Sequence, residues 1–175
     1  MEFTQKELYD LMNRPGPLWL VGADLKEANL IGASLKRANL YNANLSRTDL
    51  RWAILEGATL NAANLTEADL REALLGTAKL VGAHLRGASL RRADLSGANL
   101  QKADLNHADL NYANLTGADL KEADLSEANL GEANLGMLAY TSEPNFTGAK
   151  YTKNTIWPTG YDPEKAGAIL VTSGE

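Results

Sequence analysis

Carboxylates are the most numerous side chains in this sequence that could do chemistry. The chain carries 22 Asp and Glu residues, and two carboxyl groups held close together can act as a general acid and base. Eight aspartates, however, lie one residue before a Leu in a single regular series: Asp24, Asp49, Asp69, Asp94, Asp104, Asp109, Asp119 and Asp124. Because the repetition alone places them in columns, we interpret them as supports of turns and ladders through bonds to the backbone.

The other reactive residues form no recognisable site. The chain has no Cys, which excludes disulfides, thiolate zinc sites and cysteine nucleophiles. Neither His84 nor His107 has a nucleophile at a recognisable spacing, and no phosphate-binding loop or dinucleotide motif is present. An unbroken repeat also lacks the inserted loops that would build a concave pocket. We therefore expect no enzyme, with no catalytic, metal or cofactor residues.

Composition limits both fold and partners. The 175 residues include 30 Leu and 27 Ala but only seven Ile and Val together, which argues against an ordinary β-sandwich or doubly wound α/β domain. The net charge of −5 argues against direct nucleic-acid binding or attachment to an anionic membrane. No apolar run approaches the length of about 20 residues that a membrane helix needs. No signal peptide is apparent, so a cytoplasmic location is expected.

A five-residue repeat organises the chain. Leu occupies every fifth position from Leu20 to Leu135, and Ala lies two residues before Leu in all but one repeat from Leu25 onward, the exception being Thr48. A period of five fits neither a helix face nor a flat strand. A short extended piece followed by a turn, once per repeat, points every Leu to a common axis. Periodicity alone leaves open whether such coils have three sides or four.

The repeats resemble those of a known family. Runs such as Ala-Asp-Leu-Lys-Glu, Ala-Asn-Leu-Thr-Gly and Ala-Asp-Leu-Ser-Glu are similar to the Ala-(Asp/Asn)-Leu-x-x pattern of the pentapeptide-repeat family, over residues 18–151. The resemblance implies an all-β fold, a right-handed quadrilateral β-helix with four repeats per coil and about six coils. The central Leu and the preceding Ala would lie inside. On this stacking, His84 would lie one coil from Asp104 and Asn64, and His107 one coil from Glu127.

Both ends of the solenoid are predicted to carry caps. Residues 1–17 should form an N-terminal helical cap, with a helix from about Gln5 to Asn13 that ends before Pro15. At the other end the register slips by one residue, so that Phe146 and Tyr151 continue the Leu column. Residues 152–175 should form a C-terminal cap, which is similar to the tail of cyanobacterial members of the family. Within this cap, Asp162-Pro163 predicts the start of a short helix.

Three functions follow as hypotheses. The first is a non-catalytic structural or protein-interaction module, because solenoids present extended surfaces to partners. The second comes from the resemblance, since some members of the family resemble duplex DNA and bind type II topoisomerases such as DNA gyrase. Here only residues 101–135 are strongly acidic, with seven Asp and Glu against two Lys. The third is a metal-dependent hydrolase that uses His84 or His107.

One region of the surface is predicted to bind a protein. On four-sided stacking, three arginines fall in one column, and an exposed Trp and two aliphatic residues lie around the next corner. The patch comprises Arg51, Trp52, Ile54, Arg71, Leu74 and Arg91. Trp and Arg beside exposed aliphatic residues are typical of an interface hot spot, although Asp49, Asp69 and Glu72 could neutralise the arginines on an ordinary surface. We expect a protein partner, and a monomer or a weak tail-to-tail dimer.

Overall fold

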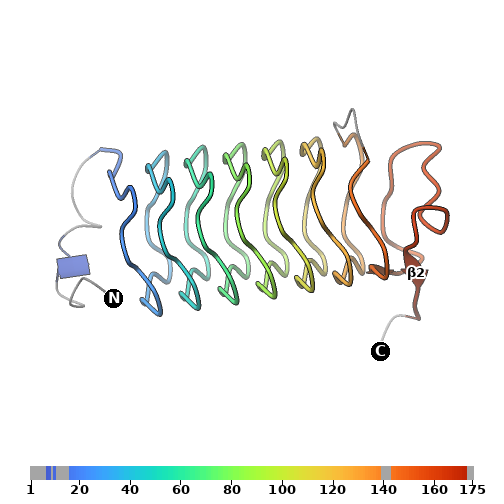
Figure 1. Ribbon diagram of the computed structural model, residues 1–175, viewed down its shortest axis with the longest axis horizontal. Coiled ribbons are helices and arrows are strands. Elements are labelled where there is room, and N and C mark those ends of the chain that lie inside the picture. The colour runs from blue at the N-terminus through green and yellow to red at the C-terminus, as the bar shows by residue number, and fades with distance from the viewer. Residues whose placement is uncertain (1–6, 9, 11–15, 139–142, 173–175) are drawn as a thin grey trace.

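Parallel bridges between residues 20 apart build the fold. The computed structural model describes residues 7–8, 10, 16–138 and 143–172. The residue before each Leu pairs with its equivalent 20 residues further on, from Trp19 with Asn39 to Asn114 with Asn134. Twenty residues are four repeats, so the chain closes one coil every four repeats. The coils lie side by side along the long axis of the molecule (Figure 1).

Each repeat turns a corner in the same way. The N–H of Ala88 donates to the carbonyl of Leu85 over 3.0 Å, and the same turn recurs along the ladder. In every repeat from Leu20 to Leu135, the second residue after the Leu has a positive φ. A β-turn of type II requires this conformation at its third residue, where Gly carries no steric cost. The turn therefore accounts for the enrichment of Gly at this position.

Asp and Asn side chains hold these turns. In all sixteen repeats that have Asp or Asn before the Leu, its side-chain oxygen accepts the backbone N–H two residues further on, as Asp94 does from Ser96 over 3.0 Å. Asp94 also accepts a bond from Asn114 in the next coil. These bonds agree with the structural role that the repetition indicated for the aspartates.

We expect Asp94→Asn to change the free energy of unfolding by less than about 0.5 kcal/mol, because the amide oxygen can accept the same two bonds. Asp94→Ala should cost about 1 kcal/mol, since the Ser96 N–H then loses its acceptor. Denaturant unfolding of both variants measures the difference. Equal stability of the Asn and Ala variants would contradict a role for this side chain in the turn.

The interior consists of the repeated Leu and Ala side chains. From Leu20 to Leu135 every Leu of the repeat is at most 4% exposed, and Leu85 is 1% exposed. Thr48, which replaces Ala once, is also fully buried, and its hydroxyl donates to the carbonyl of Leu25 over 2.9 Å. A buried hydroxyl is tolerated there because it has a hydrogen-bond acceptor.

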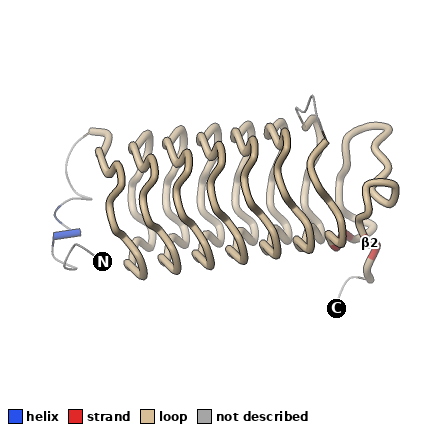
Figure 2. The backbone as a smooth tube through the Cα atoms, viewed as in Figure 1, coloured by secondary structure: helices blue, strands red, loops and turns tan. Residues whose placement is uncertain are grey.

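Regular strands are short. The ladder consists mostly of isolated bridges between turns, so most of the chain in Figure 2 is drawn as loop. The described residues contain two strands, β1 (Lys150–Tyr151) and β2 (Ile169–Leu170), which pair in parallel. Across the same residues, no helix has the length and apolar character that crossing a membrane requires.

Only part of the predicted N-terminal cap can be compared with the structure. Residues 7, 8 and 10 are helical, and the Leu8 side chain is 1% exposed as part of the core cluster. Both ends of the expected helix lie outside the described residues.

The C-terminal register follows the predicted slip and then slips again. Asp124 pairs with Asn145, 21 residues away, whereas Asn134 pairs with Ile156, 22 residues away. The Phe146 side chain occupies the next place in the Leu column and is 1% exposed. The second inserted residue was not predicted.

The short helix predicted from Asp162-Pro163 is wrong, because residues 163–167 form turns. Asp162 does accept the N–H of Lys165 as an N-cap would. Gly167, with φ of 84°, ends the segment. The Ile169 N–H then donates to the Ala149 carbonyl, where β2 pairs with β1. Pairing with the last coil therefore replaces the helix after a single turn.

Candidate protein-binding surface

The predicted arginine column is present, and its charges are locally paired. Its members occupy the same position in successive coils: Arg51, Arg71 and Arg91. Each forms an ion pair with an aspartate: Arg51 with Asp49 (2.7 Å) and Asp69 (3.6 Å), Arg71 with Asp69 (2.5 Å), and Arg91 with Asp109 (3.2 Å). These pairs offset the repulsion between stacked arginines.

Hydrogen bonds favour the ionised forms of the aspartate and arginine side chains in these pairs. Bonds from the Arg51 guanidinium lower the pKa of Asp49, and together with the Arg51 N–H and the nearby positive charges they outweigh the effect of burial, which raises it. The bond to Asp49 raises the pKa of Arg51, and the bond to Asp69 raises the pKa of Arg71. The column is therefore a row of oriented ion pairs rather than a bare positive surface.

Trp52 stands at the corner beside the column. Its side chain is 53% exposed, and the guanidinium carbon of Arg51 lies 5.7 Å from its ring centroid. An exposed Trp with a cation over its face provides a large, rigid contact area. Trp52 has φ of 57°, as the corner position requires.

Ile54 and Leu74 lie around that corner in adjacent coils. The two residues form a parallel bridge, so their side chains are neighbours on one face. Leu74 is 39% exposed, whereas Ile54 is half-buried. Both occupy the position where most repeats have Asp or Asn, and they therefore replace two polar residues with an apolar pair.

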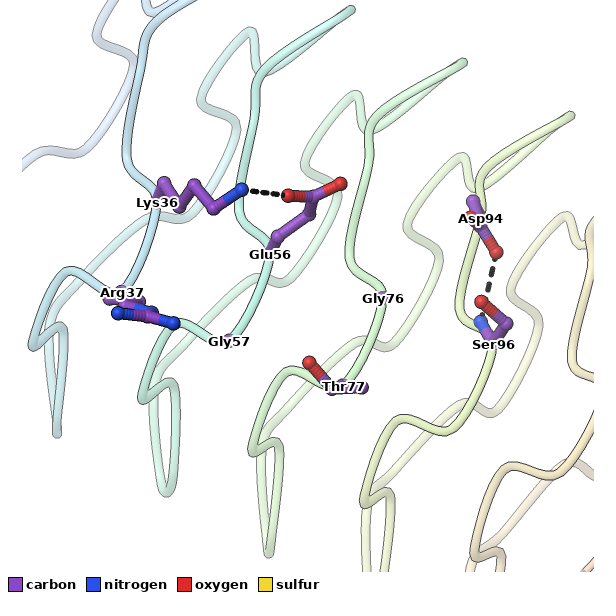
Figure 3. A pocket seen from close by; sticks show the side chains of 8 residues that line it. All are labelled: Lys36, Arg37, Glu56, Gly57, Gly76, Thr77, Asp94 and Ser96. Carbon is purple, nitrogen blue, oxygen red and sulfur yellow. Dashed lines mark hydrogen bonds and ion pairs between the residues drawn. The ribbon is translucent and has the colours of Figure 1, made fainter.

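A hollow of about 350 Å³ lies on the same face, and the sequence reasoning missed it. Figure 3 shows the side chains that line it: Lys36, Arg37, Glu56, Gly57, Gly76, Thr77, Asp94 and Ser96. Gly57 and Gly76 contribute no side chains, and the Lys36 ammonium bonds to Glu56 over 2.6 Å. The signal for the hollow was Gly76, which occupies the first position after Leu, where Gly does not otherwise occur before Gly131.

A second exposed apolar group lies on the first two coils. Trp19 is 80% exposed, Val21 54% and Tyr41 49%. Trp19 and Val21 flank Leu20, and the Gly22 N–H bonds to the Tyr41 carbonyl of the next coil. The sequence reasoning did not single out these residues, although Trp19 precedes a Leu where Asp or Asn is usual.

The two histidines lie in the predicted columns. His84 is bridged to Asn64 on one side and Asp104 on the other. Within the described residues, no group of three or more His, Cys, Asp or Glu side chains is arranged to hold a metal ion.

Comparison with known proteins identifies the repeat. The family model for pentapeptide repeats matches in eight copies over residues 20–57, 43–80, 63–106 and 98–136. None of the curated proteins matches the chain.

Several solved structures are similar. HetL, a pentapeptide repeat protein involved in heterocyst differentiation regulation in the cyanobacterium Nostoc sp. strain PCC 7120, is 27% identical, with a TM-score of 0.51. The match covers 94% of this chain and 91% of HetL. The pentapeptide repeat protein alr5209 from Nostoc PCC 7120 is 36% identical over 70% of this chain and 84% of its own, with a TM-score of 0.34. QnrB1, a plasmid-mediated fluoroquinolone resistance protein, is 18% identical over 89% of this chain and 90% of its own, with a TM-score of 0.39.

Proposed function

The chain belongs to the pentapeptide-repeat family, and from this membership we propose that it is a non-catalytic module that binds a protein partner. A solenoid of uniform coils offers extended faces, which suit binding to another macromolecule better than enclosing a small substrate. HetL, which is similar over most of its length, is involved in regulation, and a regulatory role is compatible with this proposal.

We infer a right-handed, four-sided solenoid of about six coils over residues 18–151, with caps formed by residues 1–17 and 152–175. The 20-residue ladder supports the coil geometry, and the buried Leu8 supports the first cap. At the other end, the Trp157 ring lies 5.2 Å from Phe146 and 5.3 Å from Tyr161. These contacts within one chain favour an intramolecular cap over a tail-to-tail dimer.

The partner-binding surface in this proposal is the predicted patch of Arg51, Trp52, Ile54, Arg71, Leu74 and Arg91. The observation that carries it is the exposed Trp52 ring packed against Arg51, next to the apolar pair. Trp and Arg are the residues most enriched at interface hot spots. The ion pairs hold the arginine side chains in place, so less conformational entropy is lost on binding.

We expect the triple variant Trp52→Ser, Ile54→Asn, Leu74→Asp to lose its cellular protein partners while keeping its melting temperature. The Asn and Asp side chains supply the turn bonds that Ile54 and Leu74 lack, so the fold should not suffer. Affinity capture from the native cell with mass spectrometry, alongside thermal unfolding, measures both properties.

A matched control is the triple variant Trp19→Ser, Val21→Thr, Tyr41→Asn, which removes exposed apolar area elsewhere. Partners lost by the first variant and kept by the control support the patch. If the first variant captures the same partners as the unmodified protein, the patch is not the binding surface.

Binding to DNA gyrase as a mimic of DNA is the alternative. A mimic of DNA needs a continuous negative surface, but the Arg51, Arg71 and Arg91 column interrupts the acidic character in the middle coils. An assay of DNA supercoiling separates the two functions, because inhibition at micromolar protein would favour the mimic.

A further inference from the structure

Most repeats use a side chain to cap a backbone N–H that faces the surface. The N–H of the first residue after each Leu takes no part in the backbone ladder. Where Asp or Asn precedes the Leu, this N–H bonds to that side chain, as Ser96 does to Asp94. Because that Asp or Asn side chain lies on the outside of the coil, the N–H must point outward too.

In three successive coils on one face this cap is missing. Ile54 is bridged to Ser34 on one side and Leu74 on the other, and none of these three side chains accepts the bond. Among the described residues, three neighbouring N–H groups therefore donate to no protein acceptor: Lys36, Glu56 and Gly76. No other column in the described part of the solenoid has three in succession, since every Asp and Asn before a Leu makes its bond.

The residues that carry these three N–H groups all line the hollow of Figure 3. Gly76 has no side chain to cover its own N–H, and no heavy atom lies closer than 3.7 Å to the position of an added Cβ. The Arg37 side chain packs along Gly57, with its Cγ 3.5 Å from the position of an added Cβ. Two cations and two anions line the hollow: Lys36 pairs with Glu56, and Asp94 accepts bonds from the Ser96 N–H and the Asn114 amide. Within the described residues, Arg37 forms no ion pair, so its guanidinium is the one cation of the lining that can meet a new acceptor.

We propose that this hollow binds the carboxylate of an Asp or Glu side chain that a partner protein presents between apolar residues. Uncapped N–H groups at the surface are free to donate to an acceptor that a partner brings, and Arg37, which forms no ion pair within the described residues, favours a negative one. Coils stacked about 4.8 Å apart place adjacent N–H groups where the two oxygens of one carboxylate can each accept a bond. Ile54 and Leu74 would contact the apolar neighbours of that carboxylate. The inference rests on the proposed function and specifies the partner's chemistry.

Amide NMR of the full chain tests the donors directly. The probes are the blocked peptides acetyl-Leu-Asp-Leu-amide and acetyl-Leu-Asn-Leu-amide, and sodium acetate. We expect the Asp peptide to shift the amide signals of Lys36, Glu56 and Gly76 saturably. The Asn peptide should bind at least tenfold more weakly, because it lacks the charge.

A pair of variants separates the N–H groups from the apolar contact. Leu74→Ala removes the apolar side chain only, whereas Leu74→Asn also supplies an acceptor for the Gly76 N–H. We expect the Asp peptide to bind Leu74→Asn at least tenfold more weakly than Leu74→Ala.

Three results would overturn the proposal: no shift with the Asp peptide, equal binding to the two variants, or equal shifts with acetate at the same concentration. The last would indicate a site for small anions instead of a protein segment. Each leaves the capture experiment on the Trp52 patch unaffected, so failure here is distinguishable from failure of the proposed function.

Discussion

Leu85→Ala should lower the free energy of unfolding by about 2–5 kcal/mol, because it leaves a cavity in the middle of the solenoid. Leu85 is 1% exposed, and its backbone N–H bonds to Asp104 in the next coil over 2.7 Å. Leu85→Asp should abolish cooperative folding, since a carboxylate would be buried without a partner. Denaturant unfolding followed by circular dichroism measures both effects.

Leu74→Ala is the matched control for this prediction. It removes the same number of atoms from the same residue type, but Leu74 is 39% exposed, so the truncation opens no enclosed cavity. We expect a loss of less than about 1 kcal/mol. If Leu85→Ala and Leu74→Ala cost the same, the enclosed Leu column does not dominate the stability.

Phe146→Ala should cost about 3–5 kcal/mol in the C-terminal coils. The Phe146 ring is 1% exposed, and the Trp157 and Tyr161 rings pack edge-on against it with centroids 5.2 and 5.9 Å away. Its loss removes a buried side chain from the C-terminal end of the column and the support of both aromatic rings. Phe146→Leu, which keeps most of the volume, should cost less than about 1.5 kcal/mol.

Hydrogen exchange shows which coils lose stability in Phe146→Ala. The Leu125 N–H bonds to Asn145, and the Leu130 N–H bonds to Lys150, so both should exchange faster in Phe146→Ala. The Leu85 N–H should keep its protection, because the stability of a repeat depends mainly on its neighbours. Equal acceleration at Leu85 would show that the whole solenoid unfolds as one unit, and unchanged exchange at all three would exclude Phe146 as a stabilising cap.

Charge pairing on the patch shows where sequence reasoning reached its limit. The repeat predicted that Arg51 and Arg71 stack, and it named Asp49 and Asp69 as possible neutralising groups. The side-chain conformations decided that these pairs form. The hollow depends in the same way on what neighbouring coils leave open, because Gly76 creates space only between the side chains above and below it.

In the C-terminal segment, a clear local signal in the sequence led to a wrong prediction. Asp162-Pro163 carries a local signal for a helix, and the Asp162 side chain makes the capping bond. The segment nevertheless ends at Gly167 after one turn, because the residues that follow pair with the last coil. Tertiary pairing outweighed the local preference, since a single helical turn gains little by itself.

The sequence by itself determined which side chains lie inside and which residues form the turns. A period of five repeats the same local geometry, so the direction of each Leu, Ala and Asp follows from its place in the repeat. Only the tertiary structure decided which outward groups meet across coils, which arginines are neutralised, and which N–H groups are left uncapped. The contacts across coils join residues about 20 apart, and each depends on the side chain that a neighbouring coil places there. The pairs of Arg51 with Asp49 and Arg71 with Asp69 join residues two apart and depend on the side-chain conformation.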